Sequence, residues 1–216
     1  MTFGKNCDSW PLGLLALFHI WLCLLGPAPL SLSHAAPQSE PEAGATGWEV
    51  EQLLESLAKN RQAEARFEET AFSNLLTQPL KTQGTLHFIP PAGLEKHITA
   101  PYDERYVVEG DRVYFESKTK ATKKTVSLHD YPALRAFIEA FRATLANDLL
   151  TLKRFYHVEL QGVPRRWVLI LHPLDTAVQE LVESIRLSGE LGQLRSIDVL
   201  APGGDRSVMV ITTGAQ

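Results

Sequence analysis

The stretch that decides the fold is residues 84–101, GTLHFIPPAGLEKHITAP. Pro90 and Pro91 cannot donate hydrogen bonds to a β-ladder, so the chain must turn at this point. On either side of the turn, residues alternate in the period-2 pattern of a strand. The residues that share one face of the strand pair are Leu86, Phe88, Leu94, Lys96 and Ile98. The stretch therefore predicts two antiparallel strands joined by a short turn.

The same alternation continues outward in both directions. Before it, Ala65, Phe67 and Glu69 share one face of a strand. After it, two short segments flank Glu109-Gly110-Asp111, a hairpin turn with glycine at its centre. Further strands are predicted near residues 123–128, 156–160, 167–171, 182–189, 197–199 and 208–212. Short strands at regular spacing, about eleven in all, indicate a strongly curved antiparallel sheet.

Three segments follow the period of a helix instead, near residues 48–60, 131–145 and 148–155. The middle one carries an apolar stripe from Leu134 to Leu145, and its alanines are expected on the opposite face. One segment is ambiguous: residues 178–185 fit a helix, whereas 182–189 also fit a strand, and periodicity does not decide between them. The fold class predicted is α+β, mainly β, with amphipathic helices covering an apolar sheet face.

The N-terminus has the composition of a cleaved secretory signal peptide, residues 1–35. An apolar run from Leu12 to Leu25 precedes Ser33-His34-Ala35, a pattern typical of a cleavage site, and the run is short for a membrane span. Residues 36–47 are then a flexible lead-in, and 48–216 form one domain. Both cysteines, Cys7 and Cys23, lie in the leader, so the mature chain is expected to contain no disulfide and no thiolate site.

The order and spacing of several motifs resemble the LolA family of periplasmic outer-membrane lipoprotein carriers. The motifs that carry the resemblance are Phe67-Glu68-Glu69, the strand and turn Gly84 to Pro91, Leu94 to Pro101, the hairpin Val107 to Phe115, and Gly204-Asp205-Arg206-Ser207. Together they span most of the chain after the leader. The resemblance implies an unclosed antiparallel barrel of about eleven strands, with helices as a lid over an apolar cavity.

The resemblance also implies which side chains would line a lipid-binding cavity. On the helices we expect Leu53, Leu54, Leu57, Leu134, Phe137, Ile138, Phe141 and Leu145. On the strands we expect Phe67, Leu86, Phe88, Val113, Phe115, Trp167 and Leu169. The same stripes are also what an ordinary packed core requires, so the pattern alone leaves a filled core open.

Two departures from the family pattern bear on function. The family usually has a basic residue just before the proline of the first turn, where this chain has Pro90. The aromatic residues of the third strand are replaced by Leu94 and Lys96. These changes indicate a specialised relative whose cargo or docking differs.

The remaining polar residues show no pattern typical of a catalytic or metal site. His87, His97, His129, His157 and His172 lack metal-ligand spacing, and the serines lack a nucleophile-elbow motif. Carboxylates such as Glu68, Glu69, Asp103 and Glu104 are interpreted as solvated strand faces. The basic run Lys118, Lys120, Lys123 and Lys124 is either a solvated hairpin or a docking patch. No cofactor, metal or catalytic residue is predicted.

The sequence thus predicts a monomeric carrier of the periplasm that takes lipidated protein or lipid cargo from an inner-membrane releasing complex to an outer-membrane acceptor. Transient contact with membrane surfaces is expected, and the mildly negative net charge of −4 makes nucleic acid an unsuitable partner. The alternatives are a non-carrier envelope scaffold with a filled barrel core, a hydrolase, and the membrane-anchored acceptor of the same superfamily. The acceptor would need a lipid-modified cysteine at its mature N-terminus, and none follows Ala35.

Overall fold

The computed structural model describes residues 48–61, 63–89 and 92–212. The predicted leader, the lead-in up to Gly47 and the departure at Pro90 lie outside these residues. Strands account for most of the described chain, in agreement with the mainly β prediction. They are β1 (Glu64–Phe72), β2 (Leu80–Ile89), β3 (Gly93–Ala100), β4 (Glu104–Glu109), β5 (Arg112–Ser117), β6 (Thr122–Ser127), β7 (Tyr156–Val163), β8 (Arg166–Pro173), β9 (Ser184–Glu190), β10 (Gln193–Leu200) and β11 (Arg206–Thr212).

All these strands belong to one antiparallel sheet in the order β6-β5-β4-β3-β2-β1-β11-β10-β9-β8-β7. Each of the two meanders, β1–β6 and β7–β11, is built from consecutive hairpins, and the β1–β11 ladder joins them, with Phe67 opposite Ile211. We call this ladder the seam. β6 and β7 are the edge strands of the sheet, so the sheet is unclosed, as predicted.

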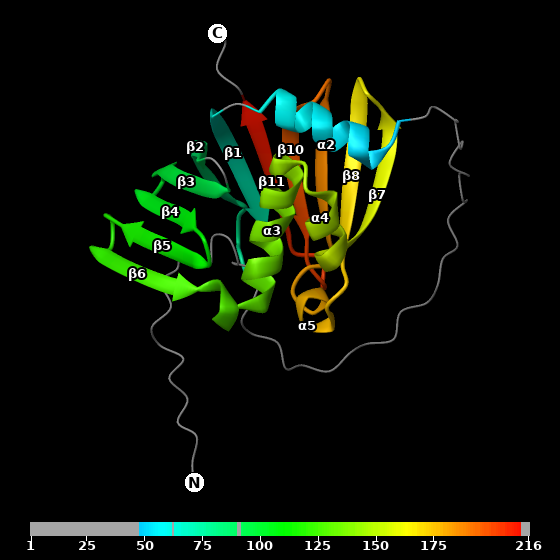
Figure 1. Ribbon diagram of the computed structural model, residues 1–216. Helices are drawn as coiled ribbons and strands as arrows, with labels where there is room; N and C mark the ends of the chain where they lie inside the picture. The colour runs from blue at the N-terminus through cyan, green and yellow to red at the C-terminus, as the bar shows by residue number, and fades with distance from the viewer. Residues whose placement is uncertain (1–47, 62, 90–91, 213–216) are drawn as a thin grey trace, which may run out of the picture.

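The helices lie over one face of this sheet (Figure 1). They are α2 (Val50–Lys59), the single 3₁₀ turn η1 (Leu128–Asp130), α3 (Pro132–Ala146), α4 (Leu149–Phe155) and α5 (Thr176–Gln179). In Figure 1, α2 crosses one end of the sheet, and α3 runs along the face where the two meanders meet. Asn147 ends α3 in the left-handed conformation, and the Asp148 side chain then caps α4 by accepting from the Thr151 amide. The chain thus reverses between α3 and α4, and α4 leads directly into β7.

The ambiguous segment near residues 178–189 contains both structures. Residues 176–179 form the short α5, and the strand interpretation is right from Ser184 onward. The Asp175 side chain caps α5 by accepting from two backbone amides. Because β9 pairs with both β8 and β10, burial of Ile185 and Leu187 on the inner face outweighs the local helical pattern.

One expectation about α3 was wrong. Its alanines were expected on an outer face, but Ala136, Ala140 and Ala143 are buried. The reason is that α3 packs against α2 and α4 as well as facing the sheet, so small side chains are needed where the helices approach one another. Phe137 and Phe141 are instead partly exposed, and they face a cavity described below.

Candidate functional site

A cavity of about 230 Å³ lies between α3 and the concave face of the sheet. One water molecule needs about 10–15 Å³ of such space, so the cavity has room for a ligand much larger than water. Its walls come from β1–β5, from β10 and β11, and from α2 and α3. The cavity therefore lies over the N-terminal meander and the seam. Most of the side chains around it are apolar.

The structure brings eight of the fifteen predicted lining residues to the wall of this cavity. They are Leu57, Leu86, Phe88, Val113, Phe137, Ile138, Phe141 and Leu145. Phe137 and Phe141 lie one helical turn apart and contact each other edge to face, with ring centroids 4.8 Å apart. This pair forms an aromatic surface on the helix that covers the cavity.

The other seven predicted residues belong to the packed core and do not border the cavity. They are Leu53, Leu54, Phe67, Phe115, Leu134, Trp167 and Leu169, all nearly or fully buried. The period-2 and helical patterns predict which side chains point inward, but not where neighbouring elements fill the space. On the C-terminal meander, Trp167 and Leu169 of β8 are fully buried in the hydrophobic core.

Several wall residues were missed by the sequence analysis. β10 contributes Ile197 and Val199, and β11 contributes Met209 and Ile211; these residues alternate as inward positions but carried no motif. Arg61, just after α2, lies over the Phe88 ring with its guanidinium carbon 3.9 Å from the centroid. Its Nη1 donates to the carbonyl oxygen of Leu145 at 3.0 Å, so it connects the ends of α2 and α3 at the cavity.

The interpretation of Glu69 as part of a solvated strand face was wrong, because Glu69 is buried in the cavity wall beside Lys96. Glu69 is 9% exposed and Lys96 is 7% exposed, and both border the cavity. Lys96 Nζ lies 2.5 Å from Glu69 Oε2, and Ser207 Oγ donates to Glu69 Oε1 at 2.7 Å. The signal was present in the sequence, because both residues occupy inward positions of their strands among apolar neighbours.

A second buried carboxylate, Glu104, lies on β4 and is 1% exposed. It accepts hydrogen bonds from the Tyr106 hydroxyl at 3.1 Å and from Ser117 Oγ at 3.3 Å. Burial, and next the nearby Glu104 carboxylate, raise the pKa of the Tyr106 phenol well above its ordinary value. Because of this raised pKa, the Tyr106 phenol stays protonated and donates to Glu104. Tyr106 also borders the cavity.

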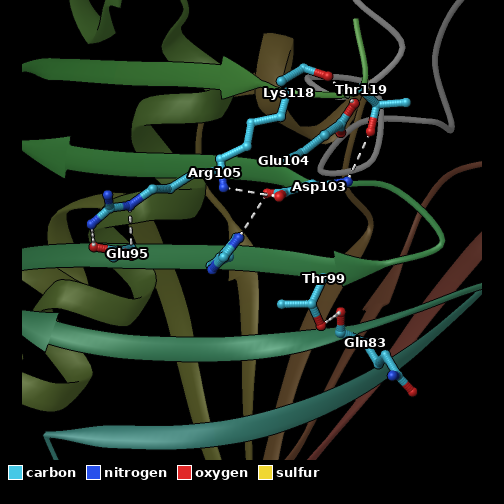
Figure 2. Close-up of polar contacts among 10 residues, drawn as sticks. Gln83, Glu95, Thr99, Asp103, Glu104, Arg105, Lys118 and Thr119 are labelled. Atoms are coloured by element: carbon cyan, nitrogen blue, oxygen red, sulfur yellow. Dashed lines mark hydrogen bonds and ion pairs between the residues drawn. The ribbon is translucent and has the colours of Figure 1, made fainter.

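Charged side chains on β3, β4 and the β5–β6 turn pair with one another instead of forming a positive surface (Figure 2). Lys118 contacts Asp103 at 3.0 Å, Lys120 lies 3.6 Å from Glu104, and Lys123 lies 2.8 Å from Glu116. Figure 2 also shows Arg105 paired with Glu95 through two hydrogen bonds. The pairing favours a hairpin of mutually neutralised charges over a basic docking patch.

Two of the histidines that lack metal-ligand spacing in the sequence lie beside carboxylates. His97 lies 3.0 Å from Asp103, and His129 lies 3.5 Å from Asp111. Over the described ranges, no three histidine, cysteine, aspartate or glutamate residues are grouped so that they could hold a metal ion. In the same ranges, no helix has the length and apolar character needed to cross a bilayer.

α3 is held to the sheet by a buried arginine. Arg142 donates from Nε to the carbonyl oxygen of Ala92 at 2.7 Å and from Nη2 to that of Gly110 at 2.8 Å. Its Nη1 also contacts Glu139 on the same helix at 3.2 Å. These contacts fix α3 to the β2–β3 and β4–β5 turns on one side of the cavity.

A covered, unclosed sheet with an apolar cavity beneath its helices is the architecture that the sequence motifs predicted. The sequence model of the outer membrane lipoprotein carrier LolA-like proteins matches residues 42–216. The chain belongs to this family. The match covers every element of the LolA-like domain that the structure describes.

Similar folds occur among solved structures, at low sequence identity. A LolA superfamily protein from Nitrosomonas europaea is 10% identical, with a TM-score of 0.39, over 76% of this chain and 91% of the other. A putative outer membrane lipoprotein-sorting protein domain from Vibrio parahaemolyticus is 11% identical, with a TM-score of 0.39, over 76% and 92%. An uncharacterised conserved protein from Thermus thermophilus is 10% identical, with a TM-score of 0.44, over 76% and 88%. Among curated proteins, no sequence is significantly similar to this chain.

Proposed function

We propose that this LolA-like protein is a lipid carrier that holds the acyl chain of a lipidated protein, or of another lipidated product, in the cavity beneath α3. The observation that supports this is an apolar cavity of about 230 Å³ that the protein's own side chains leave unfilled. Burial of an acyl chain contributes about 0.8 kcal/mol per CH₂. About ten buried CH₂ groups would then supply about 8 kcal/mol, which corresponds to micromolar affinity.

The proposed binding surface has two parts. The wall is formed by strand residues such as Leu86, Phe88 and Val113, and the cover by Phe137 and Phe141. The seven predicted residues in the packed core would support this surface without touching the lipid. Transfer needs no covalent chemistry: a state with α3 closed on the sheet and a state with α3 displaced would differ in affinity for the cargo.

The route follows from the sequence. A secretory leader would deliver the chain to the periplasm, where a monomeric carrier would receive cargo from an inner-membrane complex and pass it to an outer-membrane acceptor. Contact with either membrane surface would be brief. No cofactor or nucleic acid enters this scheme, and the chain would act by binding rather than as an enzyme.

The test is to place a charge on the cover of the cavity. Phe137→Glu and Phe141→Glu should each abolish co-purification of lipid and uptake of a fluorescent acyl probe, because an unpaired carboxylate in an apolar cavity is strongly unfavourable. Leu150→Glu is the matched control: Leu150 lies on α4, is 81% exposed and does not border the cavity. Circular dichroism would establish that each variant is folded.

The outcomes separate the carrier from the scaffold. Lipid in the native preparation, lost in both phenylalanine variants and kept in the control, supports the carrier. If the purified native protein contains no lipid by mass spectrometry and takes up no acyl probe, the carrier proposal is wrong. A non-carrier envelope interaction module would then be the better interpretation.

A further inference from the structure

Two opposite charges are buried in the wall of a cavity that is otherwise largely apolar. Glu69 comes from β1 and Lys96 from β3, with β2 between them. On β2, Gly84 is in register with Phe67 on one side and with Ile98 on the other, so it occupies an inward position without a side chain. Across β2, Lys96 Nζ and Glu69 Oε2 lie 2.5 Å apart.

The two partners of this pair differ in how many hydrogen bonds they make. Glu69 Oε1 accepts from Ser207, and Oε2 accepts from Lys96 and from Thr82 at 3.4 Å. The Lys96 ammonium has three N–H donors, and Glu69 takes one of them. The ammonium also lies over the Phe67 ring, with Nζ 5.0 Å from the centroid. The carboxylate is therefore satisfied, whereas the ammonium retains donor capacity at the wall of the cavity.

We propose that Lys96 donates a hydrogen bond to a neutral carbonyl oxygen of the bound lipid, namely the ester group of an acyl chain. This inference rests on the proposed carrier function and adds a polar anchor to it. A pure hydrocarbon would bury the ammonium without supplying an acceptor. An ester supplies the acceptor and leaves the charge of the Lys96–Glu69 pair balanced.

A free fatty acid fits this site less well than an ester. Its carboxylate would add a second negative charge beside Glu69, and Glu104 is also buried one strand further along the sheet. A buried carboxylate is tolerated where it has its own positive partner, and Lys96 is already paired with Glu69. The Lys96–Glu69 pair therefore favours acyl esters over both hydrocarbons and free acids of the same chain length.

The experiment compares three competitors of equal chain length for displacement of a fluorescent acyl probe: a methyl ester, the free carboxylate and the alkane. With the native protein, the ester should bind roughly tenfold more tightly than the alkane, as expected for a hydrogen bond from a charged donor. The infrared stretching frequency of the bound ester carbonyl should fall relative to the same ester in hydrocarbon solvent. Both measurements are made on the native chain.

A double variant then assigns the preference to this pair. Lys96→Met with Glu69→Met removes both charges together, so that neither is left buried alone. In this variant the ester and the alkane should displace the probe equally well, and the infrared shift should be lost. Lys123→Met, which removes one member of an exposed ion pair, is the control and should change none of these values.

Each outcome bears on a distinct statement. Equal affinity of the native protein for ester and alkane, or an ester preference that survives in the double variant, would overturn the role of Lys96 while leaving the carrier function intact. Tighter binding of the carboxylate would overturn it in favour of a free fatty acid. No displacement by any competitor, with no binding of the acyl probe itself, would contradict the carrier function and this inference together.

Discussion

The Arg142 guanidinium on α3 donates a 2.8 Å hydrogen bond from Nη2 to the carbonyl oxygen of Gly110, in the turn between β4 and β5. A second bond from Nε reaches Ala92, near the start of β3. One side chain of the helix that covers the cavity is thus fixed to two turns of the sheet. Because these turns lie beside the wall that includes Val113, the strength of this attachment should control how readily the cavity opens.

Replacing Arg142 should loosen α3. In Arg142→Ala, the carbonyl oxygens of Ala92 and Gly110 lose a charged donor, so the free energy of unfolding should fall by about 1–3 kcal/mol. Urea denaturation measures the loss, and amide exchange in α3 should speed up more than exchange in β8. Arg142→Lys keeps the charge but not the forked geometry of the guanidinium. Its free energy of unfolding should therefore lie between those of the native protein and Arg142→Ala. Unchanged exchange in α3 would contradict the attachment.

Filling the cavity should separate binding from stability. Val199 lies on β10 at the cavity wall and is only partly buried, so Val199→Phe should keep stability within about 1 kcal/mol of the native value or raise it. If the larger ring displaces about two CH₂ groups of an acyl chain, affinity should fall by about 1.6 kcal/mol, or roughly fifteen-fold. Probe titration and thermal unfolding check the two parts. Unaltered affinity for the acyl probe would show that the bound acyl chain does not contact Val199.

Gly84 should tolerate no side chain. A Cβ there would lie 1.8 Å from the His97 carbonyl oxygen on β3, which is a clash with backbone. We expect Gly84→Ala to cost at least about 3 kcal/mol or to prevent folding. Gly110→Ala is the comparison, because Gly110 has φ +54° and no atom lies within 4 Å of the added Cβ. Only the left-handed backbone conformation is then unfavourable for alanine, and it should lower the free energy of unfolding by about 1–2 kcal/mol. Equal losses in the two variants would refute the close approach of β2 and β3.

The Glu95–Arg105 pair should make stability depend on acid pH. The hydrogen bonds from Arg105 hold the pKa of the Glu95 carboxyl below its ordinary value of 4.5. The unfolded chain therefore takes up this proton first as the pH falls. The stabilisation is complete above about pH 4.5 and is lost as the pH drops through the lower pKa of the folded state.

Glu95→Gln removes this contribution. The variant should be less stable than the native protein at about pH 7 by at most about 1 kcal/mol, and the difference should vanish near pH 2. Chemical denaturation at the two pH values measures it. A difference that stays the same at both would mean that the pair contributes through packing rather than charge.

The strands could be predicted from sequence because alternation reports directly which side chains point inward. Phe67, Phe88 and Trp167 were all assigned to the inner face, and all are buried. The order of the strands was not encoded locally, since it depends on β1 pairing with β11 across the length of the chain. The prediction of an unclosed barrel covered by a helical lid came from the resemblance to the family, because alternation alone does not predict that arrangement.

The candidate site was predictable only in part, for a physical reason. An inward side chain borders a cavity only if the covering helix leaves space there, and helix packing is a long-range property. Hence Phe137 borders the cavity, whereas Trp167 lies in the packed core. Glu69 and Lys96 were visible as charged residues at inward positions, but the sequence did not show that β2 would let them meet.

The seam between β1 and β11 has a consequence for how the chain is made. All the other ladders of the described sheet join strands that follow one another, so each meander can form as hairpins while the chain emerges. The two meanders gain a common ladder only when residues 206–212 are available. β11 thus unites the sheet, because the two meanders remain separate until this strand has been synthesised.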